Sequence, residues 1–457
     1  MLMNDMRLFI FSDLWGVLST KEALAVYIIV LLATVVFLVI AVLVSSHSSP
    51  RVVSVIGAGG ESEGASQSKK PESDDRQNGQ ETEAGEDGEL PDSNRTGDNP
   101  RFEELTRIDR TMVDYRAPAF DETIGLAELC ERFRNFAAYR LHLYYSIDDI
   151  RRFIASLGVS PIIIMQGMSG TGKTSLASAF GNFVQHDSTI IPIQPMWKER
   201  SDMIGYFNEF TERFNEMTLL KNLYEANYTR EIYVTVLDEM NIARVEYYFA
   251  EMLSILEMPR EEDWKVDIVT SVWDNDPCLI NSGTVQITNN IWFVGTINND
   301  DSTFAVADKV YDRAIPIDLD SRADAFECES TPPIFVSTDR LIELFNEAKE
   351  QYPISQEMLD KLEVLNAYLI KNFRLAFGNR IMKQIKDYVP CFIGCGGTEI
   401  QAVDFIVAKK VLRKFESLSL GFMREELTKF SAYLDKLFGK NTMVICKEYI
   451  EQLKKNM

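Results

Sequence analysis

The chain of 457 residues has a hydrophobic fraction of 46% and a charged fraction of 25%, as expected for a folded globular protein with room for more than one domain. Its formal net charge of −22 at pH 7 argues against broad, nonspecific binding to nucleic acid or anionic lipid, so nucleic acid is not indicated as a partner. The six cysteines lack the spacing of a disulfide framework or a zinc ribbon, which fits reduced thiols in a cytosolic compartment.

Residues 23–44 form an uncharged, strongly apolar run. A helix of this length spans roughly 33 Å, which is enough to cross a bilayer. A cleaved signal peptide is the competing interpretation, but the run is longer than a usual signal core and residues 1–22 precede it. We therefore expect a single-pass transmembrane helix, with residues 1–22 as an N-terminal segment at the membrane interface.

Residues 45–100 follow as an expected linker. From residue 57 on, the composition is dominated by Gly, Ser, Glu, Asp, Asn and Gln, with almost no large apolar side chain. Such a segment buries too little apolar surface to offset its chain entropy. We expect an acidic, disordered tether, and the same composition also occurs in segments that bind a partner.

Residues 161–180 have the sequence Pro-Ile-Ile-Ile-Met-Gln-Gly-Met-Ser-Gly-Thr-Gly-Lys-Thr-Ser-Leu-Ala-Ser-Ala-Phe, and two helices are predicted before them within residues 124–153. This stretch contains a glycine, four residues and then Gly-Lys-Thr, located between a β-branched strand and a helix-forming run. This spacing and context are typical of a phosphate-binding loop. Glycines let backbone N–H groups form a concave anion site at a helix start. The expected nucleotide-binding residues are Gly167, Ser169, Gly170, Thr171, Gly172, Lys173, Thr174 and Ser175.

Two residues of this loop have expected roles of their own. Lys173 would bind the β- and γ-phosphates of a nucleoside triphosphate, and Thr174 would be a ligand of Mg²⁺. Downstream, a strand is expected at 189–194, and short helices are expected at 201–207 and 217–226.

The β-branched and aromatic run at residues 231–237 predicts a strand that ends in an acidic pair, Asp238 and Glu239. A carboxylate at the end of such a strand can hold the water shell of Mg²⁺, and its neighbour can orient and deprotonate an attacking water. We therefore expect Asp238 to be the metal-side residue and Glu239 to be the general base.

Two further features follow this acidic pair. Residues 264–269 and 283–288 alternate like strands around a turn, which predicts a β-hairpin, and its contact with a substrate stays open. Residues 291–297 predict a strand that would deliver the amide of Asn298 to the site, with Asn299 as the neighbouring candidate.

Three stretches together resemble the AAA+ ATPases of the MoxR and McrB type, which are related to the dynein-like ATPase domain. They are Leu-Asp-Glu-Met-Asn-Ile-Ala-Arg from residue 237, Trp-Phe-Val-Gly-Thr-Ile-Asn-Asn from residue 292, and Asp-Lys-Val-Tyr-Asp-Arg-Ala from residue 308. The resemblance covers residues 125–410. It implies an α/β fold, in which a P-loop AAA+ core with a parallel sheet sandwiched by helices and with β-hairpin inserts is followed by an all-helical lid.

The resemblance also implies roles for three polar residues. Asn298 would be the sensor that ends the fourth core strand, and Arg380 would open a lid helix and point toward the γ-phosphate. Arg313, just before the fifth strand expected at 315–319, would act in trans at the site of a neighbouring subunit. From the residues alone, Arg313 could instead pair with Asp312 or Asp318, and Arg380 could be an ordinary surface arginine.

The rest of the chain is predicted to be helical, because apolar residues recur at three and four spacing in residues 341–348, 358–370, 381–389, 400–415 and 447–455. We expect a large α/β subdomain at 101–325 and the helical lid with C-terminal helices at 326–457.

The leading hypothesis is a membrane-anchored AAA+ ATPase with its ATPase domain in the cytoplasm, where nucleotide is plentiful. It would bind and hydrolyse Mg-ATP at the subunit interfaces of a homo-oligomeric ring, expected to be a hexamer, and so remodel or activate a protein client or a von Willebrand factor A type partner.

One alternative is a McrB-like, GTP-driven motor of a restriction or defence complex. That family carries Asn-Thr-Ala-Asp where this chain has Asn-Asn-Asp-Asp from residue 298, and no DNA-reading domain precedes the core. A nucleotide-gated membrane scaffold is the third hypothesis, disfavoured by the intact loop and acidic pair.

Overall fold

The computed structural model describes residues 100–298, 303–320, 323–418 and 424–455. All described residues belong to the second of two units of the chain, which comprises residues 87–457. The predicted transmembrane helix at 23–44, the segment 1–22 and residues 45–99 of the predicted linker lie outside the described residues. Within the described part of the chain, no helix combines the length and the apolar character needed to cross a membrane.

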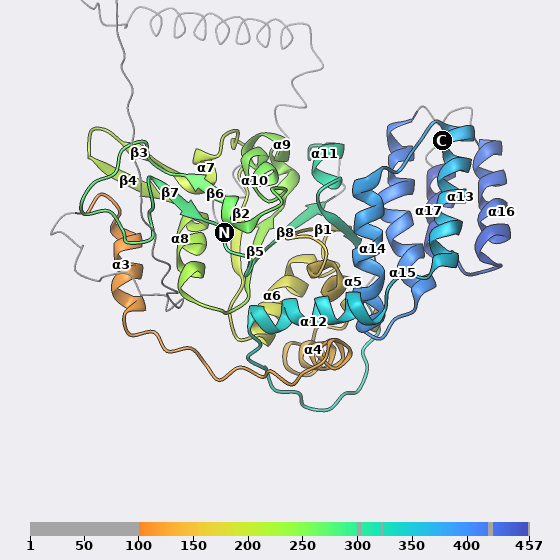
Figure 1. Ribbon diagram of the computed structural model, residues 1–457, viewed down its shortest axis with the longest axis horizontal. Coiled ribbons are helices and arrows are strands. Elements are labelled where there is room, and N and C mark those ends of the chain that lie inside the picture. Colours follow the sequence, from red (N-terminus) through yellow and green to blue (C-terminus); the bar gives the residue numbers. More distant parts are fainter. Residues whose placement is uncertain (1–99, 299–302, 321–322, 419–423, 456–457) are drawn as a thin grey trace, which may run out of the picture. The chain divides into compact units, whose positions relative to one another are not determined.

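The second unit is an α/β fold followed by a helical region (Figure 1). Its strands are β1 (Ile162–Gly167), β2 (Thr189–Pro192), β3 (Gly205–Asn208), β4 (Arg213–Glu216), β5 (Tyr233–Asp238), β6 (Lys265–Asp267), β7 (Thr284–Gln286), β8 (Ile291–Asn298) and β9 (Ile315–Asp318). The helices up to β9 are α3 (Glu103–Met112), α4 (Leu126–Leu141), α5 (Ile147–Leu157), α6 (Lys173–Phe183), α7 (Ser201–Ile204), α8 (Thr218–Glu225), α9 (Val245–Tyr248), α10 (Ala250–Ile255) and α11 (Asp308–Tyr311). The later helices are α12 (Thr338–Gln351), α13 (Gln356–Phe373), α14 (Asn379–Gly394), α15 (Glu399–Ile406), α16 (Arg424–Phe438) and α17 (Val444–Lys455).

The central sheet has five strands in the order β2-β5-β8-β1-β9, and every neighbouring pair is parallel. The predicted parallel α/β fold with a helical C-terminal region is therefore confirmed. Strand β8 lies between β1 and β5, with Asn298 opposite Gly167 and Gly295 opposite Leu237. Because parallel strands end at one edge of a sheet, the residues that follow β1, β5, β8 and β9 meet there.

Each face of the sheet packs against its own hydrophobic core. Alternation along β1 divides its side chains, so that Ile163 and Met165 belong to one core and Ile162 and Ile164 to the other. The first core also contains side chains of α4, α5, α6 and the C-terminal helices, and the second contains those of α3, α8, α10 and both hairpins. The helical region is thus packed onto one face of the sheet.

One of the two hairpins was predicted and the other was not. Strands β6 and β7 pair antiparallel where the alternation predicts them. The helix predicted at 201–207 ends at Ile204, and β3 then pairs with β4, so that part of the prediction is wrong. Gly205 has φ +107°, and a Cβ there would lie 1.8 Å from the carbonyl oxygen of Asn215. The glycine ends the helix and permits the close approach of β4, a contact that local periodicity does not encode.

The helix predicted across 400–415 is also interrupted. α15 ends at Ile406, and a π-helical turn (Val407–Val411) and a 3₁₀ segment (Leu412–Ser417) follow it. The π-helical turn contains two buried lysines, Lys409 and Lys410. Such turns inside helices occur frequently at functional positions.

Candidate nucleotide site

The predicted phosphate loop connects the end of β1 to the start of α6. Gly167 has φ +141°, and a Cβ on it would lie 2.4 Å from the carbonyl oxygen of Leu319, so no larger residue fits. Gly172 precedes α6 with φ +95°, and the Tyr145 hydroxyl donates a hydrogen bond of 3.0 Å to its carbonyl. These two glycines let the backbone turn tightly into the helix N-terminus, where N–H groups favour an anion.

Lys173, the first residue of α6, lies beneath this loop and is only 6% exposed. Its Nζ donates to the carbonyl oxygens of Gly167 at 3.0 Å and Met168 at 2.7 Å. Burial lowers the pKa of Lys173, and the carboxylates of Asp238, Asp320 and Glu239 oppose that shift.

The other predicted loop residues differ in their exposure to solvent. Ser169 and Gly170 are exposed, and Thr171 and Ser175 are half-buried. The hydroxyl of Thr171 closes the loop by donating to the carbonyl of Met168 at 3.0 Å.

Asp238, at the end of β5, faces two hydroxyl groups. Thr174 Oγ1 donates to Asp238 Oδ1 at 2.7 Å, and Thr296 Oγ1 of β8 donates to the same oxygen at 2.9 Å. A carboxylate and a hydroxyl are hard oxygen donors of the kind that Mg²⁺ prefers, so the residues present fit this ion. Among the described residues, no group of three or more His, Cys, Asp and Glu side chains is arranged to hold a metal. Mg²⁺ held here would therefore need further oxygen ligands from phosphates and water.

Glu239 lies next to this pair in a strained backbone conformation. Its φ of 53° and ψ of 47° fall in the left-handed region, which is uncommon for a residue with a Cβ. Its N–H donates to Thr296 Oγ1 at 2.9 Å, and Asn298 Nδ2 donates to Glu239 Oε1 at 3.3 Å. Asn241 Nδ2 in turn donates to the Asn298 carbonyl at 3.0 Å. The structure thus places Asn298 beside Glu239, while Asn299 lies outside the described residues.

Sequence reasoning missed two residues of this cluster. Thr296 is a polar residue in an otherwise apolar strand. It lies two positions before Asn298 and therefore on the same face of the strand, so the sequence could have indicated that it belongs to the site. Asp320 lies close to Gly167 and Lys173 because β9 pairs with β1, which no local pattern reveals. Burial raises the pKa of Asp320, and Lys173 opposes this shift.

Arg313 and Arg380 lie at the opposite end of the sheet. The Arg313 carbonyl accepts a hydrogen bond of 2.8 Å from Ser160, just before β1, whereas the phosphate loop follows β1. Arg380 binds the same carboxylate as Arg313, that of Glu257. We expected Arg380 to point toward the γ-phosphate from the lid, but within one chain it is separated from Lys173 by the length of β1, roughly 20 Å. Helix α14 begins beside the start of the strands, and this packing sets the position of Arg380.

The Arg313 side chain has partners other than the two carboxylates considered from the sequence. It forms its ion pair with Glu257 rather than with Asp312 or Asp318, and its Nη1 donates to the carbonyl of Lys309 at 3.0 Å. An open cavity of 580 Å³ adjoins Arg313 and Arg380.

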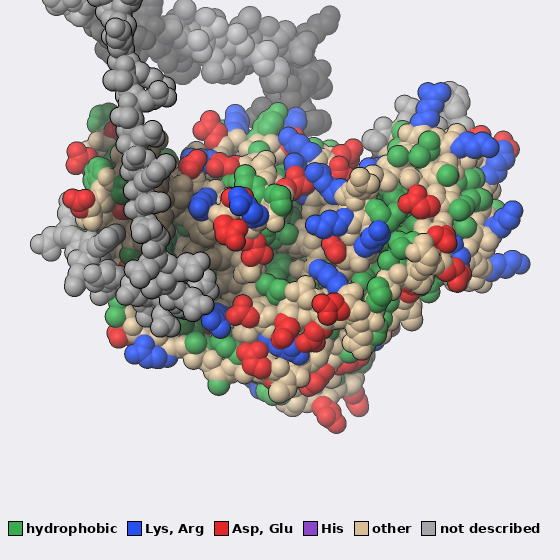
Figure 2. Space-filling view, viewed as in Figure 1, with side chains coloured by type: hydrophobic (Ala, Val, Ile, Leu, Met, Phe, Trp, Pro, Cys, Tyr) green, Lys and Arg blue, Asp and Glu red, His purple; other side chains and the backbone are tan. Residues whose placement is uncertain are grey.

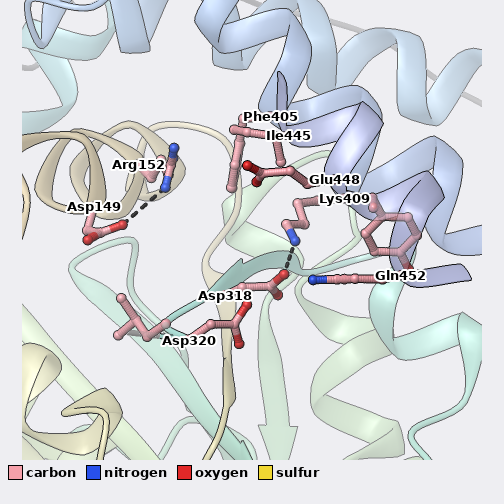
Figure 3. Close-up of a pocket in the computed structure, with 11 residues that line it drawn as sticks. Asp149, Arg152, Asp318, Asp320, Phe405, Lys409, Ile445, Glu448 and Gln452 are labelled. Carbon is pink, nitrogen blue, oxygen red and sulfur yellow. Dashed lines mark hydrogen bonds and ion pairs between the residues drawn. The ribbon is translucent and has the colours of Figure 1, made fainter. Parts of the chain in front are cut away.

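A second cavity, of 230 Å³, lies between α5, the end of β9, the π-helical turn and α17 (Figure 3). Lys409 forms an ion pair with Asp318 across it, and Glu448 and Gln452 of α17 face it. Asp320 also lines this cavity and lies close to Gly167, so the cavity adjoins the predicted phosphate loop.

No protein-family model matches the chain, and no curated protein matches its sequence. Among solved structures, the chain is similar to the crystal structure of a protein proposed to be an ATPase from Cytophaga hutchinsonii. The two sequences are 12% identical, the match covers 65% of this chain and 83% of that chain, and the TM-score is 0.40. A similarity of this size assigns neither a family nor an activity, so the function has to be inferred from the site.

Proposed function

We propose that this chain is an ATP hydrolase that uses Mg²⁺. One observation carries the proposal: Lys173, Thr174, Asp238 and Glu239 come from two separate segments and meet at the carboxyl edge of one parallel sheet. Phosphoryl transfer to water requires groups of these kinds: a buried ammonium under a glycine loop, a hydroxyl paired with a carboxylate, and a second carboxylate beside them.

Each of these groups has a distinct part in the proposed reaction. The Lys173 ammonium and the N–H groups of the loop bind the β- and γ-phosphates and orient the γ-phosphate for attack. Thr174 and Asp238 would hold Mg²⁺, which neutralises charge that develops on the phosphate oxygens. Asn298 donates to Oε1 of Glu239, which leaves Oε2 to accept a proton from the attacking water.

The proposed class is an AAA+ ATPase of the MoxR and McrB type. Two features support this class. The strand order puts β8 and its Asn298 between β1, which leads into the loop, and β5, which ends in the acidic pair, and a helical region follows β9. We further propose that residues 23–44 anchor the chain in a membrane with the ATPase part in the cytoplasm. The chain would act as a homo-oligomeric ring, proposed to be a hexamer, that remodels or activates a protein partner, for example one of the von Willebrand factor A type.

The positions of the two arginines support the oligomer. Arg313 and Arg380 lie far from the loop of their own chain, and the transition state of phosphoryl transfer is stabilised by arginine supplied in trans in other enzymes. A second copy of the chain is therefore the proposed source of both arginines.

The test is steady-state hydrolysis by the purified full-length chain with Mg-ATP and with Mg-GTP. Turnover of ATP is expected to exceed that of GTP, and Glu239→Gln should lower kcat roughly 100-fold or more while nucleotide binding is kept. Lys173→Ala should lose nucleotide binding. Glu131→Gln, which changes an exposed glutamate of α4, is the matched control and should behave as the wild type. Hydrolysis by Glu239→Gln at the wild-type rate would overturn the assignment of the base.

A further inference from the structure

Glu257, two residues after α10, binds both arginines at once. Its Oε2 lies 2.6 Å from Nε of Arg313, and its Oε1 lies 2.9 Å from Nη2 of Arg380. The contact with Arg313 is a close ion pair whose N–H is not aligned for a hydrogen bond. Arg313 precedes a strand of the sheet and Arg380 lies in the first turn of the long helix α14, so one carboxylate joins the α/β part to the helical region.

The surroundings explain why a carboxylate is needed between them. The side chains of Arg313, Arg380 and Glu257 are 21%, 53% and 27% exposed, so solvent screens the two guanidinium groups only in part. Lys383 lines the same cavity and adds positive charge, and the carboxylates of Glu261 and Asp387 also line it. Figure 2 shows Lys and Arg side chains gathered near the junction of the sheet with α14. Glu257 is the carboxylate that contacts both arginines, and its charge offsets their mutual repulsion.

Glu257 also leaves most of each guanidinium group free to act. Arg380 uses one nitrogen on Glu257 and has no other hydrogen bond or ion pair within the described part of the chain. Arg313 uses Nε on Glu257 and Nη1 on a backbone carbonyl, so Nη2 keeps its donors. An anion that enters the cavity beside them can therefore bind both arginines without displacing the carboxylate.

We propose that Glu257 is a positioning residue that holds Arg313 and Arg380 as a pair, ready to receive the triphosphate bound to a second copy of this chain. This inference rests on the proposed function, because it takes the arginines to act in trans. Glu257 touches neither the nucleotide nor the reacting atoms, and its effect passes through the geometry of the pair.

The first test compares Glu257→Gln with Glu257→Asp in the full-length chain. Glu257→Gln should lower kcat about tenfold to a hundredfold, the loss typical for partners that orient catalytic groups, with KM for ATP changed less than about twofold. Glu257→Asp keeps the charge and should recover a large part of kcat. Glu262→Gln, an exposed carboxylate five residues further on, is the control and should match the wild type. An increase in kcat for Glu257→Gln would overturn the proposal, because it would mean that Glu257 restrains the arginines.

The second test assigns the effect to one side of the subunit contact. A Glu239→Gln chain cannot hydrolyse ATP but can donate its arginines to a neighbouring copy. An Arg313→Ala chain keeps its own Glu239 but cannot donate Arg313. Mixing the two chains should therefore restore turnover. Adding Glu257→Gln to the first chain should lower the restored rate about tenfold, the lower end of the loss expected for an orienting partner, and adding it to the second should change little. If no mixture restores turnover, the trans-acting site of the proposed function fails. If mixtures restore turnover equally wherever Glu257→Gln stands, only the role of Glu257 fails, and its ion pairs are structural.

Discussion

At the scale of single residues, Thr296 is the side chain that joins the two acidic residues of the site. Its hydroxyl donates to Asp238 and accepts from the N–H of Glu239, so it sets the position of both carboxylates. The second bond also stabilises Glu239 in its left-handed backbone conformation, which costs of order 1 kcal/mol or more. A single hydroxyl thus supports the expected metal residue and the expected base together.

We predict that Thr296→Val lowers kcat about tenfold to a hundredfold and raises the Mg²⁺ concentration that gives half-maximal activity. Valine has nearly the same shape as threonine, so the core should tolerate it, but both hydrogen bonds are lost. Thr296→Ser keeps the hydroxyl and should stay close to the wild type. Magnesium titrations of the ATPase rate measure both quantities, and identical titrations for the Val and Ser variants would contradict the role of the hydroxyl.

At the scale of elements, the π-helical turn binds strand β9 at both ends through consecutive lysines. Lys409 pairs with Asp318 at the carboxyl end of β9, on the side of the phosphate loop (Figure 3). Lys410 Nζ donates to the carbonyls of Tyr311, Asp312 and Ala314, just before β9, at 2.6, 3.1 and 2.8 Å. The same turn of the helical region therefore contacts the segment beside the candidate nucleotide site and the segment that carries Arg313.

The burial of Lys410 predicts a pH dependence of stability. Burial is the largest cause that lowers the pKa of Lys410 to about 7, and the side chain is 4% exposed. In the unfolded chain a lysine keeps its proton up to about pH 10.4. Between these pH values the unfolded state binds more protons, so the free energy of unfolding rises as pH rises from about 7 toward 10.

Lys410→Met removes this group and should flatten the profile. The difference in the free energy of unfolding, wild type minus variant, should increase between pH 7 and 9 by at most about 1.4 kcal/mol per pH unit. Urea unfolding of both proteins at several pH values measures the difference. Lys440→Met, at an exposed lysine, is the control. Parallel profiles for the wild type and Lys410→Met would show that this proton is not linked to folding.

At the scale of the whole molecule, the two ends of the sheet carry different parts of one proposed active site. Lys173, Asp238 and Glu239 lie at the carboxyl edge, and Arg313 and Arg380 lie at the amino edge, roughly 20 Å away along β1. A rigid sheet cannot bring its own edges together. We therefore propose that a complete site is formed by two copies of the chain, each of which offers a different edge.

We predict that ATP turnover per chain rises steeply with protein concentration until assembly is complete. Arg313→Ala should bind nucleotide at every concentration yet turn it over about 1,000-fold more slowly, the lower end of the effect of an arginine supplied in trans. Arg107→Ala, which changes an exposed arginine of α3, should follow the wild-type curve. Turnover that is independent of concentration, measured down to the monomeric range, would exclude a site shared between copies.

The sequence by itself determined the elements whose signals are local. The glycine spacing, the flanking strand and the acidic pair predicted a phosphate loop with Lys173, Thr174, Asp238 and Glu239, and the structure brings these four residues together. Loop geometry and strand ends are encoded within a few residues, so this prediction was possible. Periodicity also located the five strands of the central sheet and the β6–β7 hairpin, but it gave no prediction for the β3–β4 hairpin, for α3, α9, α10, α11 and α16, or for the π-helical turn.

Only the tertiary structure decided which distant residues meet. Strand order brought Thr296 to Asp238 and Asp320 to Lys173, and helix packing brought Arg380 to Glu257 instead of to its own phosphate loop. These contacts join residues that lie far apart in the chain, and their partners are selected by the burial of whole sheet and helix faces. No local pattern of residue types carries that information, because the hydrophobic effect that selects it is not directional.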